Sequence, residues 1–252
     1  MSNTSPSLKR NIEILDAVRG GYVFVRDNFD FLLKAAIIPI LVSCINYITI
    51  AILDEDTSVF QSFLMTLPSS FVFAWYAFIQ IRLHVYGETF GKRYGKNRQS
   101  LMVSSMSLYL LFQMFLVCVS FALVTVVSPS PETQDLSTGQ VIMILSTLIF
   151  MLWAMKFSIL HIIAAVGANL KDYVKRVQGL WFSYTLLGVG ILSVLPIGMI
   201  FMFILSILMP NPAHIEQSSL IGLYACLSVM NWAIITMLNA SAVETLKQLY
   251  QK

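Results

Sequence analysis

Six long apolar runs constrain the fold of this chain more than any other feature. A run of roughly 20 apolar residues makes a helix that crosses about 30 Å of hydrocarbon, and backbone polar groups in lipid are satisfied only inside helices or closed barrels. The composition agrees with lipid as the solvent, because 57% of the residues are hydrophobic and only 12% are charged. The sequence therefore predicts an all-α polytopic membrane protein with six transmembrane helices. The runs are Phe31 to Leu53, Val59 to Val85, Leu101 to Val127, Val141 to Ala168, Leu180 to Met209 and Leu220 to Val243.

The segment before the first run has a different pattern. Its apolar residues recur every three or four positions with charged residues between them, which predicts an amphipathic helix that lies along the membrane surface. We expect the pair Gly20-Gly21 to bend or interrupt this helix. No short apolar core with a small-residue cleavage site precedes the first run, so we expect that run to direct insertion. The predicted organisation is a cytoplasmic amphipathic segment over residues 1–30 and a six-helix transmembrane domain over residues 31–252.

The basic residues lie on one side of the predicted membrane topology. All 16 lysines and arginines fall in the terminal segments, in the loops after the second and fourth runs, or in the parts of the runs that lead to these places. The loops after the first, third and fifth runs contain no lysine or arginine. Because basic residues in short loops stay on the cytoplasmic side, the sequence predicts that both termini are cytoplasmic.

Three tryptophans mark an internal repeat. Trp75, Trp153 and Trp232 are 78 and 79 residues apart (153 − 75 and 232 − 153), and each lies in a run that leads toward the basic side. Arginines before the odd-numbered runs keep the same interval, and a histidine follows each of the first two tryptophans: Arg19, Arg98, Arg176, His84 and His161. We expect three tandem units, each a basic amphipathic segment followed by a transmembrane hairpin, related by an axis along the membrane normal.

Motifs of familiar enzymes are missing from the sequence. It contains no Gly-rich phosphate loop, nucleophile elbow or zinc-binding helix motif. The three cysteines lie singly in three apolar runs, which is typical of small buried side chains rather than of disulfides or metal ligands. Cys44, Cys118 and Cys226 therefore predict no metal site, and no cofactor is expected.

Ionisable residues inside the runs are the candidate sites. Lys156 and His161 lie within the fourth run, and a lysine at membrane depth faces the bundle interior, a water-filled cavity or a partner unless it snorkels to the headgroups. Arg82, His84 and Glu88 lie at the basic end of the second run, where an Arg82–Glu88 pair and a phospholipid headgroup site are both reasonable. Uncharged polar residues in the runs are expected to hydrogen-bond between helices. They are Asn46, Gln61, Gln80, Gln113, Asn231 and Asn239.

Two basic segments near the membrane suggest contact with anionic lipid. Each basic residue close to an anionic surface contributes about 1 kcal/mol to the attraction. The four charges of the first segment are too few and too close to the membrane to predict nucleic-acid binding. The candidate residues for a lipid headgroup or partner are Lys92, Arg93, Lys96, Arg98, Lys171, Lys175 and Arg176, together with Arg82, His84 and Glu88.

Two short stretches carry a family resemblance. They are Ala17 to Leu33, AVRGGYVFVRDNFDFLL, before the first run, and Ile81 to Glu88, IRLHVYGE, at the end of the second. With them the chain resembles uncharacterised bacterial six-helix inner-membrane proteins, including the membrane domain that is sometimes fused to glycerophosphodiester phosphodiesterases. The resemblance implies a place in a bacterial cytoplasmic membrane. It implies no phosphodiesterase activity, because the sequence has no such catalytic domain.

Two functions stay open at this point. The first is a non-enzymatic membrane protein that binds anionic phospholipid, a membrane-protein partner or a second copy of itself through its basic segments. The second is a transporter or small pore in which Lys156, His161 and kinks at Pro68 and Pro196 form the pathway. A water-filled cavity that reaches Lys156 would favour the second function, and a packed bundle with basic grooves would favour the first. An integral lipid enzyme is a third alternative.

Overall fold

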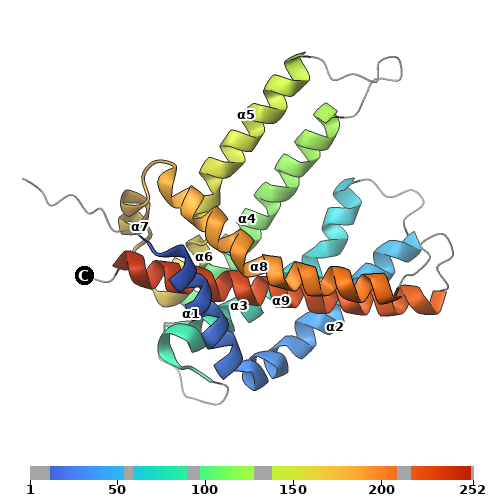
Figure 1. Cartoon of the computed structure of the whole chain (residues 1–252), viewed down its shortest axis with the longest axis horizontal. Coiled ribbons are helices and arrows are strands. Elements are labelled where there is room, and N and C mark those ends of the chain that lie inside the picture. The colour runs from blue at the N-terminus through green and yellow to red at the C-terminus, as the bar shows by residue number, and fades with distance from the viewer. Residues whose placement is uncertain (1–11, 54–58, 90–96, 128–137, 209–216, 251–252) are drawn as a thin grey trace, which may run out of the picture.

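The computed structural model describes residues 12–53, 59–89, 97–127, 138–208 and 217–250, and every regular element in these ranges is a helix (Figure 1). Six helical stretches are long and apolar enough to cross a membrane. They coincide with the six predicted runs, so the prediction of an all-α polytopic membrane protein is confirmed. The elements are α1 (Ile14–Asp27), α2 (Phe29–Leu53), α3 (Val59–Tyr86), α4 (Arg98–Val127), α5 (Thr138–Ala154), η1 (Met155–Phe157), α6 (Leu160–Val166), α7 (Leu170–Arg176), α8 (Trp181–Leu208) and α9 (Gln217–Tyr250).

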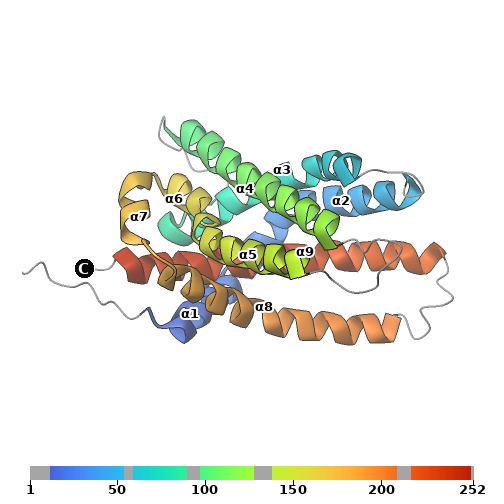
Figure 2. The same ribbon diagram turned by 90° about the horizontal axis from the view of Figure 1, so that it is seen from above.

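The prediction that Gly20-Gly21 interrupts the first helix was wrong. α1 runs through both glycines without a break and packs against α9 and α8 (Figure 2). A Cβ on Gly21 would lie 2.5 Å from Ser241 Oγ and 2.9 Å from Ser241 N, and one on Gly20 would lie 2.8 Å from Glu244 Cγ. The two glycines therefore let α1 approach the backbone of α9, and this close contact outweighs their low helix propensity.

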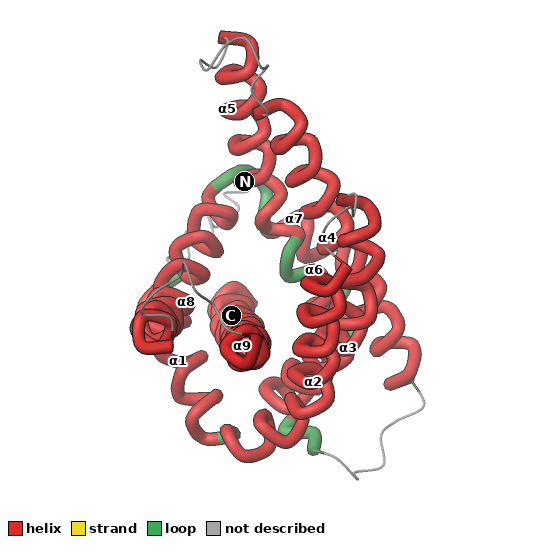
Figure 3. Tube along the Cα trace, turned by 90° about the vertical axis from the view of Figure 1, so that its right-hand side faces the viewer, coloured by secondary structure: helices red, strands yellow, loops and turns green. Residues whose placement is uncertain are grey.

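The contacts between spans follow a cyclic order. Within each predicted unit the two spans pack together, since α2 contacts α3, α4 contacts α5 and α6, and α8 contacts α9. The first span of each unit also contacts the second span of another unit: α4 lies against α3, α8 against α5 and η1, and α2 against α9. The tube view along α9 shows α1 and α8 on one side of this helix and α2 and α3 on the other (Figure 3). A ring of three hairpins is the arrangement that three tandem units would form.

One hairpin departs from the others. In Figures 1 and 3 the ends of α4 and α5 that lie away from α6 splay outward from the pair α8 and α9. α4 packs on α3, α5 and α6 but not closely on α8 or α9. The ring is therefore open on the side where α4 faces α8 and α9.

The fourth predicted span is broken near its basic end. The α-helix stops at Ala154, a short 3₁₀ turn follows, and a second α-helix begins at Leu160. Four side chains donate to carbonyls around this break: Ser183 Oγ to Trp153 O (3.3 Å), Tyr173 OH to Lys156 O, His161 Nδ1 to Ser158 O (2.8 Å) and Ser105 Oγ to His161 O (2.9 Å). Irregular backbone at membrane depth persists only where such partners are present.

The prolines do not break their spans. α3 continues through Pro68 and α8 continues through Pro196 as single helices. The break of the fourth span thus falls where the sequence has neither proline nor glycine.

The charged segments of the described chain gather at one end of the bundle. This basic end is formed by α1 and α7, by the last turns of α3, α6 and α9, and by the first turns of α4 and α8. The beginning and end of the described chain meet there, since Glu13 N donates to Gln248 Oε1 at 2.9 Å. A buried cluster around Tyr173 and Phe182 lies at this end, and a second cluster, around Tyr76 and Phe73, lies deeper in the bundle.

Candidate functional site

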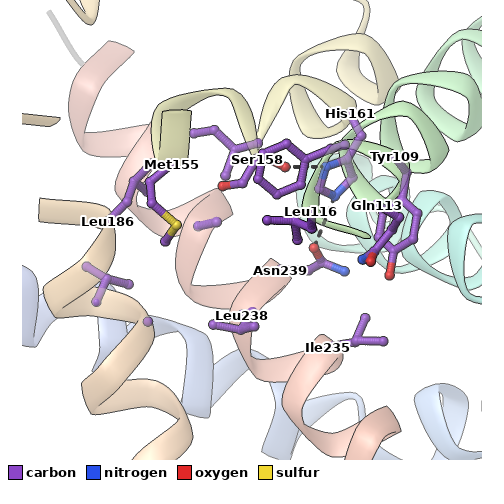
Figure 4. A pocket seen from close by; sticks show the side chains of 15 residues that line it. Tyr109, Gln113, Leu116, Met155, Ser158, His161, Leu186, Ile235, Leu238 and Asn239 are labelled. Carbon is purple, nitrogen blue, oxygen red and sulfur yellow. Dashed lines mark hydrogen bonds between the residues drawn. The ribbon is translucent and has the colours of Figure 1, made fainter. Parts of the chain in front are cut away.

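A cavity of about 280 Å³ lies where the ring is open, between α4, η1, α6, α8 and α9 (Figure 4). Most of its lining is aliphatic or aromatic, and its polar side chains come from α4, the turn before α6, α6 and α9. No lysine, arginine, aspartate or glutamate lines it. The polar side chains of the lining are Tyr109, Gln113, Ser158, His161 and Asn239.

A chain of buried hydrogen bonds leads from this cavity into the bundle. His161 Nδ1 lies 2.8 Å from Ser158 O, and His161 Nε2 lies 3.1 Å from Asn239 Oδ1. Asn239 Nδ2 lies 3.4 Å from Gln80 Oε1, and Gln80 Nε2 donates to Thr236 O at 2.6 Å. The chain thus joins α6, α9 and α3, and backbone carbonyls fix both of its ends.

A second short set of bonds continues from the same turn of α9. Thr236 Oγ1 lies 2.8 Å from Tyr76 OH, and Trp232 Nε1 donates to Tyr76 OH at 2.9 Å. Trp232 is buried with its indole N–H paired, so it fills space between α9 and α3. Trp153, at the corresponding position of the second predicted unit, is 40% exposed on α5.

The bonded residues occupy corresponding positions of the predicted units. His161 and Asn239 are separated by 78 residues, and Gln80 and Thr236 by 156. These separations are one and two repeat lengths. These two bonds join positions that correspond in the predicted repeat, whereas the bond between Asn239 and Gln80 spans 159 residues and does not.

Lys156 and His161 do not form one polar site. Lys156 is buried but does not line the cavity. Its Nζ donates to Gly179 O at 3.2 Å and lies 4.5 Å from the centroid of the Trp153 ring. The lysine thus reaches the connection between α7 and α8 at the basic end, and it ties that connection to the break in the fourth span.

Tyr173 also connects α7 to the break in the fourth span. Its hydroxyl donates to Lys156 O, and its ring is fully buried among α6, α8 and α9 residues. Burial raises the pKa of the Tyr173 hydroxyl, so the group remains a donor at neutral pH. α7 is therefore anchored through one residue on its inner face.

Arg82 and Glu88 form the pair that the sequence suggested. Arg82 Nε donates to Glu88 Oε2 at 3.0 Å, and Arg82 Nη1 donates to Ala165 O at 3.2 Å. Arg98 Nε lies 3.6 Å from the same carboxylate. Tyr86 OH donates to Val166 O at 2.8 Å. Arg82 and Tyr86 thus satisfy carbonyls at the C-terminus of α6, where helix carbonyls lack partners.

His84 makes contacts within the protein. His84 Nε2 lies 2.7 Å from Glu244 Oε1, which also pairs with Lys247 at 2.7 Å. The ring of Phe24 stacks on the imidazole with centroids 3.7 Å apart. His84 therefore helps to hold α1, α3 and α9 together.

The remaining predicted residues divide into two groups. Lys171, Lys175 and Arg176 are exposed on α7, and the guanidinium of Arg176 lies 4.9 Å from the ring centroid of Tyr250. Lys92, Arg93 and Lys96 lie outside the described residues. Headgroup binding by any of these side chains stays a prediction.

Sequence reasoning identified the polar residues but not their convergence. Gln80, Gln113 and Asn239 were expected to bond between helices, and Gln80 and Asn239 do so. The cavity that Gln113 and Asn239 share with His161 was not foreseen. The separation of 78 residues between His161 and Asn239 was the available signal, but an asparagine in place of a histidine hides it.

Comparisons with protein-family models, with curated proteins and with solved structures found no match for this chain. The described residues contain no group of three or more histidine, cysteine, aspartate or glutamate side chains that could hold a metal ion. Function is therefore argued from the geometry of this chain alone.

Proposed function

We propose that this chain is a non-enzymatic integral membrane protein that binds anionic phospholipid headgroups at its basic end. The observation that carries the proposal is the outer face of α7. There Lys171 and Lys175 are exposed together with Leu170 (37% exposed) and Val174 (44% exposed), while Tyr173 fixes the helix to the bundle. A short helix that presents cations beside apolar side chains suits the boundary between headgroups and acyl chains.

Neighbouring elements extend this surface. Trp181, at the start of α8, is 43% exposed, which suits the membrane interface. On α1, Arg19 and Arg26 are exposed beside Leu15 (72%) and Val23 (39%). Arg26 pairs with Asp27, which is adjacent to it in the chain, so it contributes less net charge than Arg19.

Internal contacts reduce the contribution of the other candidates. The side chains of Arg82 and Glu88 are 14% and 15% exposed and bind each other, and that of His84 is 3% exposed. We therefore assign headgroup binding to α7 first, with α1 as a secondary contact. Arg98 at the start of α4 is 27% exposed and lies near Glu88.

Orientation and kinship form part of the same proposal. The one-sided distribution of lysine and arginine supports a cytoplasmic position for the basic end, and with it for both termini. The stretches at 17–33 and 81–88 support kinship with bacterial inner-membrane proteins of the six-helix type. A membrane-protein partner or a second copy could use the same basic surface.

Transport is less well supported. The cavity reaches His161 but not Lys156, and Pro68 and Pro196 lie within continuous helices. None of Lys156, Pro68 and Pro196 lines the cavity, so these parts of the expected pathway do not come together there.

Native mass spectrometry tests the lipid proposal. The protein is reconstituted in nanodiscs of equal parts phosphatidylglycerol and phosphatidylcholine, released gently, and analysed for retained lipid. We expect a preference for phosphatidylglycerol that falls roughly 30-fold at low salt in the double variant Lys171→Gln/Lys175→Gln, because each of the two cations contributes about 1 kcal/mol.

A matched control lies on the same helix. Asp172→Asn removes a charge of opposite sign from the exposed face of α7, so the preference for the anionic lipid should be kept or increased. Equal retention of both lipids by the unmodified protein would show that the basic end does not select headgroups.

A further inference from the structure

We propose that the cavity between α4, η1, α6, α8 and α9 binds one acyl chain of a membrane lipid. This site is separate from the headgroup surface of α7, and the proposal does not depend on that surface. It rests on the position, the lining and the hydrogen bonding of the cavity.

The position of the cavity selects a hydrophobic occupant. Its lining on α4 begins at Tyr109, 11 residues beyond Arg98, and its lining on α8 begins at Leu186, 5 residues beyond Trp181. At about 1.5 Å per residue the cavity begins about 16 Å along α4 and about 8 Å along α8, so it extends from below the membrane interface into the hydrocarbon. Because the ring is open between α4 and α8, molecules that enter come from the lipid rather than from water.

The absence of acidic and basic side chains from the lining excludes a charged headgroup. No lysine, arginine, aspartate or glutamate lines the cavity, and the nearest cation in sequence, Lys156, directs its Nζ to Gly179 O. A phosphate buried here would lack a countercharge, and burying an unpaired charge is strongly unfavourable. The occupant must therefore be uncharged inside the cavity.

The polar groups of the lining are largely used within the protein. His161 is bonded at both ring nitrogens, and Asn239 lies between His161 and Gln80. The rest of the lining consists of apolar side chains such as Leu116. They can make dispersion contacts with an alkyl chain and shield it from solvent. A flexible chain without hydrogen-bonding groups is the occupant that leaves this network intact.

Size agrees with one chain rather than a whole lipid. A volume of about 280 Å³ lies at the lower end of ligand pockets. The cavity is lined by five elements, so it offers more contact to a chain than the convex lipid-facing surfaces of α4 and α8 do. An acyl chain should therefore stay there longer than on the outer faces.

Photocrosslinking in nanodiscs tests this proposal. Two probes carry a diazirine in the acyl chain, one a phosphatidylcholine and the other a free fatty acid. Labelled positions are located by peptide mass spectrometry. We expect label at residues 109–116 of α4 and 186–190 of α8 in excess over the outward faces of the same helices.

Matched variants separate the cavity from the outer surface. Leu116→Trp fills the cavity from α4 and should lower its labelling roughly tenfold, because several methylene groups of the chain lose their burial. Leu111→Trp is the control, since Leu111 is 60% exposed on the same helix, and should leave the labelling unchanged. Gln113→Leu replaces a polar side chain of the lining with an apolar one and should not reduce the labelling of the cavity.

Each outcome decides the proposal. Labelling by the phosphatidylcholine probe alone identifies a bilayer lipid as the source, and labelling by the fatty acid probe identifies a free acyl chain; both support it. Even labelling over all lipid-facing positions, or labelling that Leu116→Trp does not change, overturns it. If Leu116→Trp fails to fold, Gly190→Leu fills the cavity from α8, where a Cβ meets Leu238 Cδ2 at an ordinary 3.5 Å.

Discussion

His161 Nε2 lies 3.1 Å from Asn239 Oδ1 in the interior of the bundle, although the two residues are 78 positions apart in the chain. The contact joins α6 to α9 and continues to Gln80 on α3. One amide therefore connects the second spans of all three units.

Replacing this amide should destabilise the bundle. Asn239→Leu keeps the size of the side chain but leaves His161 Nε2 and Gln80 Oε1 without their partner. Each buried polar group that loses its partner costs about 1–3 kcal/mol, so we expect a clear fall in the melting temperature in detergent. Asn231→Leu on the same helix is the control, because Asn231 is only partly buried. Equal melting of both variants would contradict a structural role for the polar chain.

Sequence reasoning recovered the spans because their signal is local. Hydropathy over a window of helix length depends on consecutive residues, and the ends of α2 and α3 fall within two residues of their prediction. The break between Ala154 and Leu160 was missed for the opposite reason. It depends on donors from other helices, such as Ser105 and Tyr173, and no window along the chain contains them.

The candidate site also combines features that the sequence predicts with features that it does not. The pairing of Arg82 with Glu88 was foreseen because six residues separate them near a helix end. The cavity was not, because it depends on how far α4 diverges from α8 and α9. Gly20 and Gly21 were misinterpreted because helix propensity is a property of the isolated helix, whereas their use depends on Ser241 and Glu244.

The packing of α1 on α9 provides a second prediction. In Gly21→Ala the new Cβ would lie 2.5 Å from Ser241 Oγ and 2.9 Å from Ser241 N. Since one of these atoms belongs to the backbone, α1 must shift, and overpacking of this kind costs about 1–3 kcal/mol. We expect a lower melting temperature and faster proteolysis within residues 14–27.

Gly222→Ala is the matched control for this experiment. It introduces the same methyl group into α9 at a position with nothing within 4 Å, and alanine should stabilise the helix there by about 0.5–1 kcal/mol. If Gly21→Ala is as stable as Gly222→Ala, then α1 does not need its close approach to α9.

A double-mutant cycle measures the Arg82–Glu88 pair. Arg82→Gln should destabilise more than Glu88→Gln, because it also removes the donor to Ala165 O. The double variant should recover part of the loss, with a coupling of about 0.5–3 kcal/mol as found for bonded neighbours. Arg82→Lys should recover less than full stability, because a lysine lacks the planar fork that contacts carboxylate and carbonyl together. Additive losses in the cycle would show that the pair contributes nothing beyond its separate contacts.

Lys156 and Tyr173 allow the roles of a buried charge and a buried hydroxyl to be separated. Lys156→Met keeps the length of the stem, loses the bond to Gly179 O and the contact with the Trp153 ring, and removes a charge with no carboxylate partner among the described residues. The lost contacts destabilise the protein, whereas removing an unpaired buried charge stabilises it. We therefore expect a free energy of unfolding within about 1 kcal/mol of that of the unmodified protein.

Tyr173→Phe should cost more than Lys156→Met. It leaves Lys156 O at the break without its donor, and it removes no unfavourable charge. The free energy of unfolding should therefore fall by about 1–3 kcal/mol. Thermal unfolding in detergent gives the comparison, and proteolysis within α7 shows whether this helix detaches first. A larger loss for Lys156→Met would mean that the ammonium group, rather than the tyrosine, fixes α7 to the fourth span.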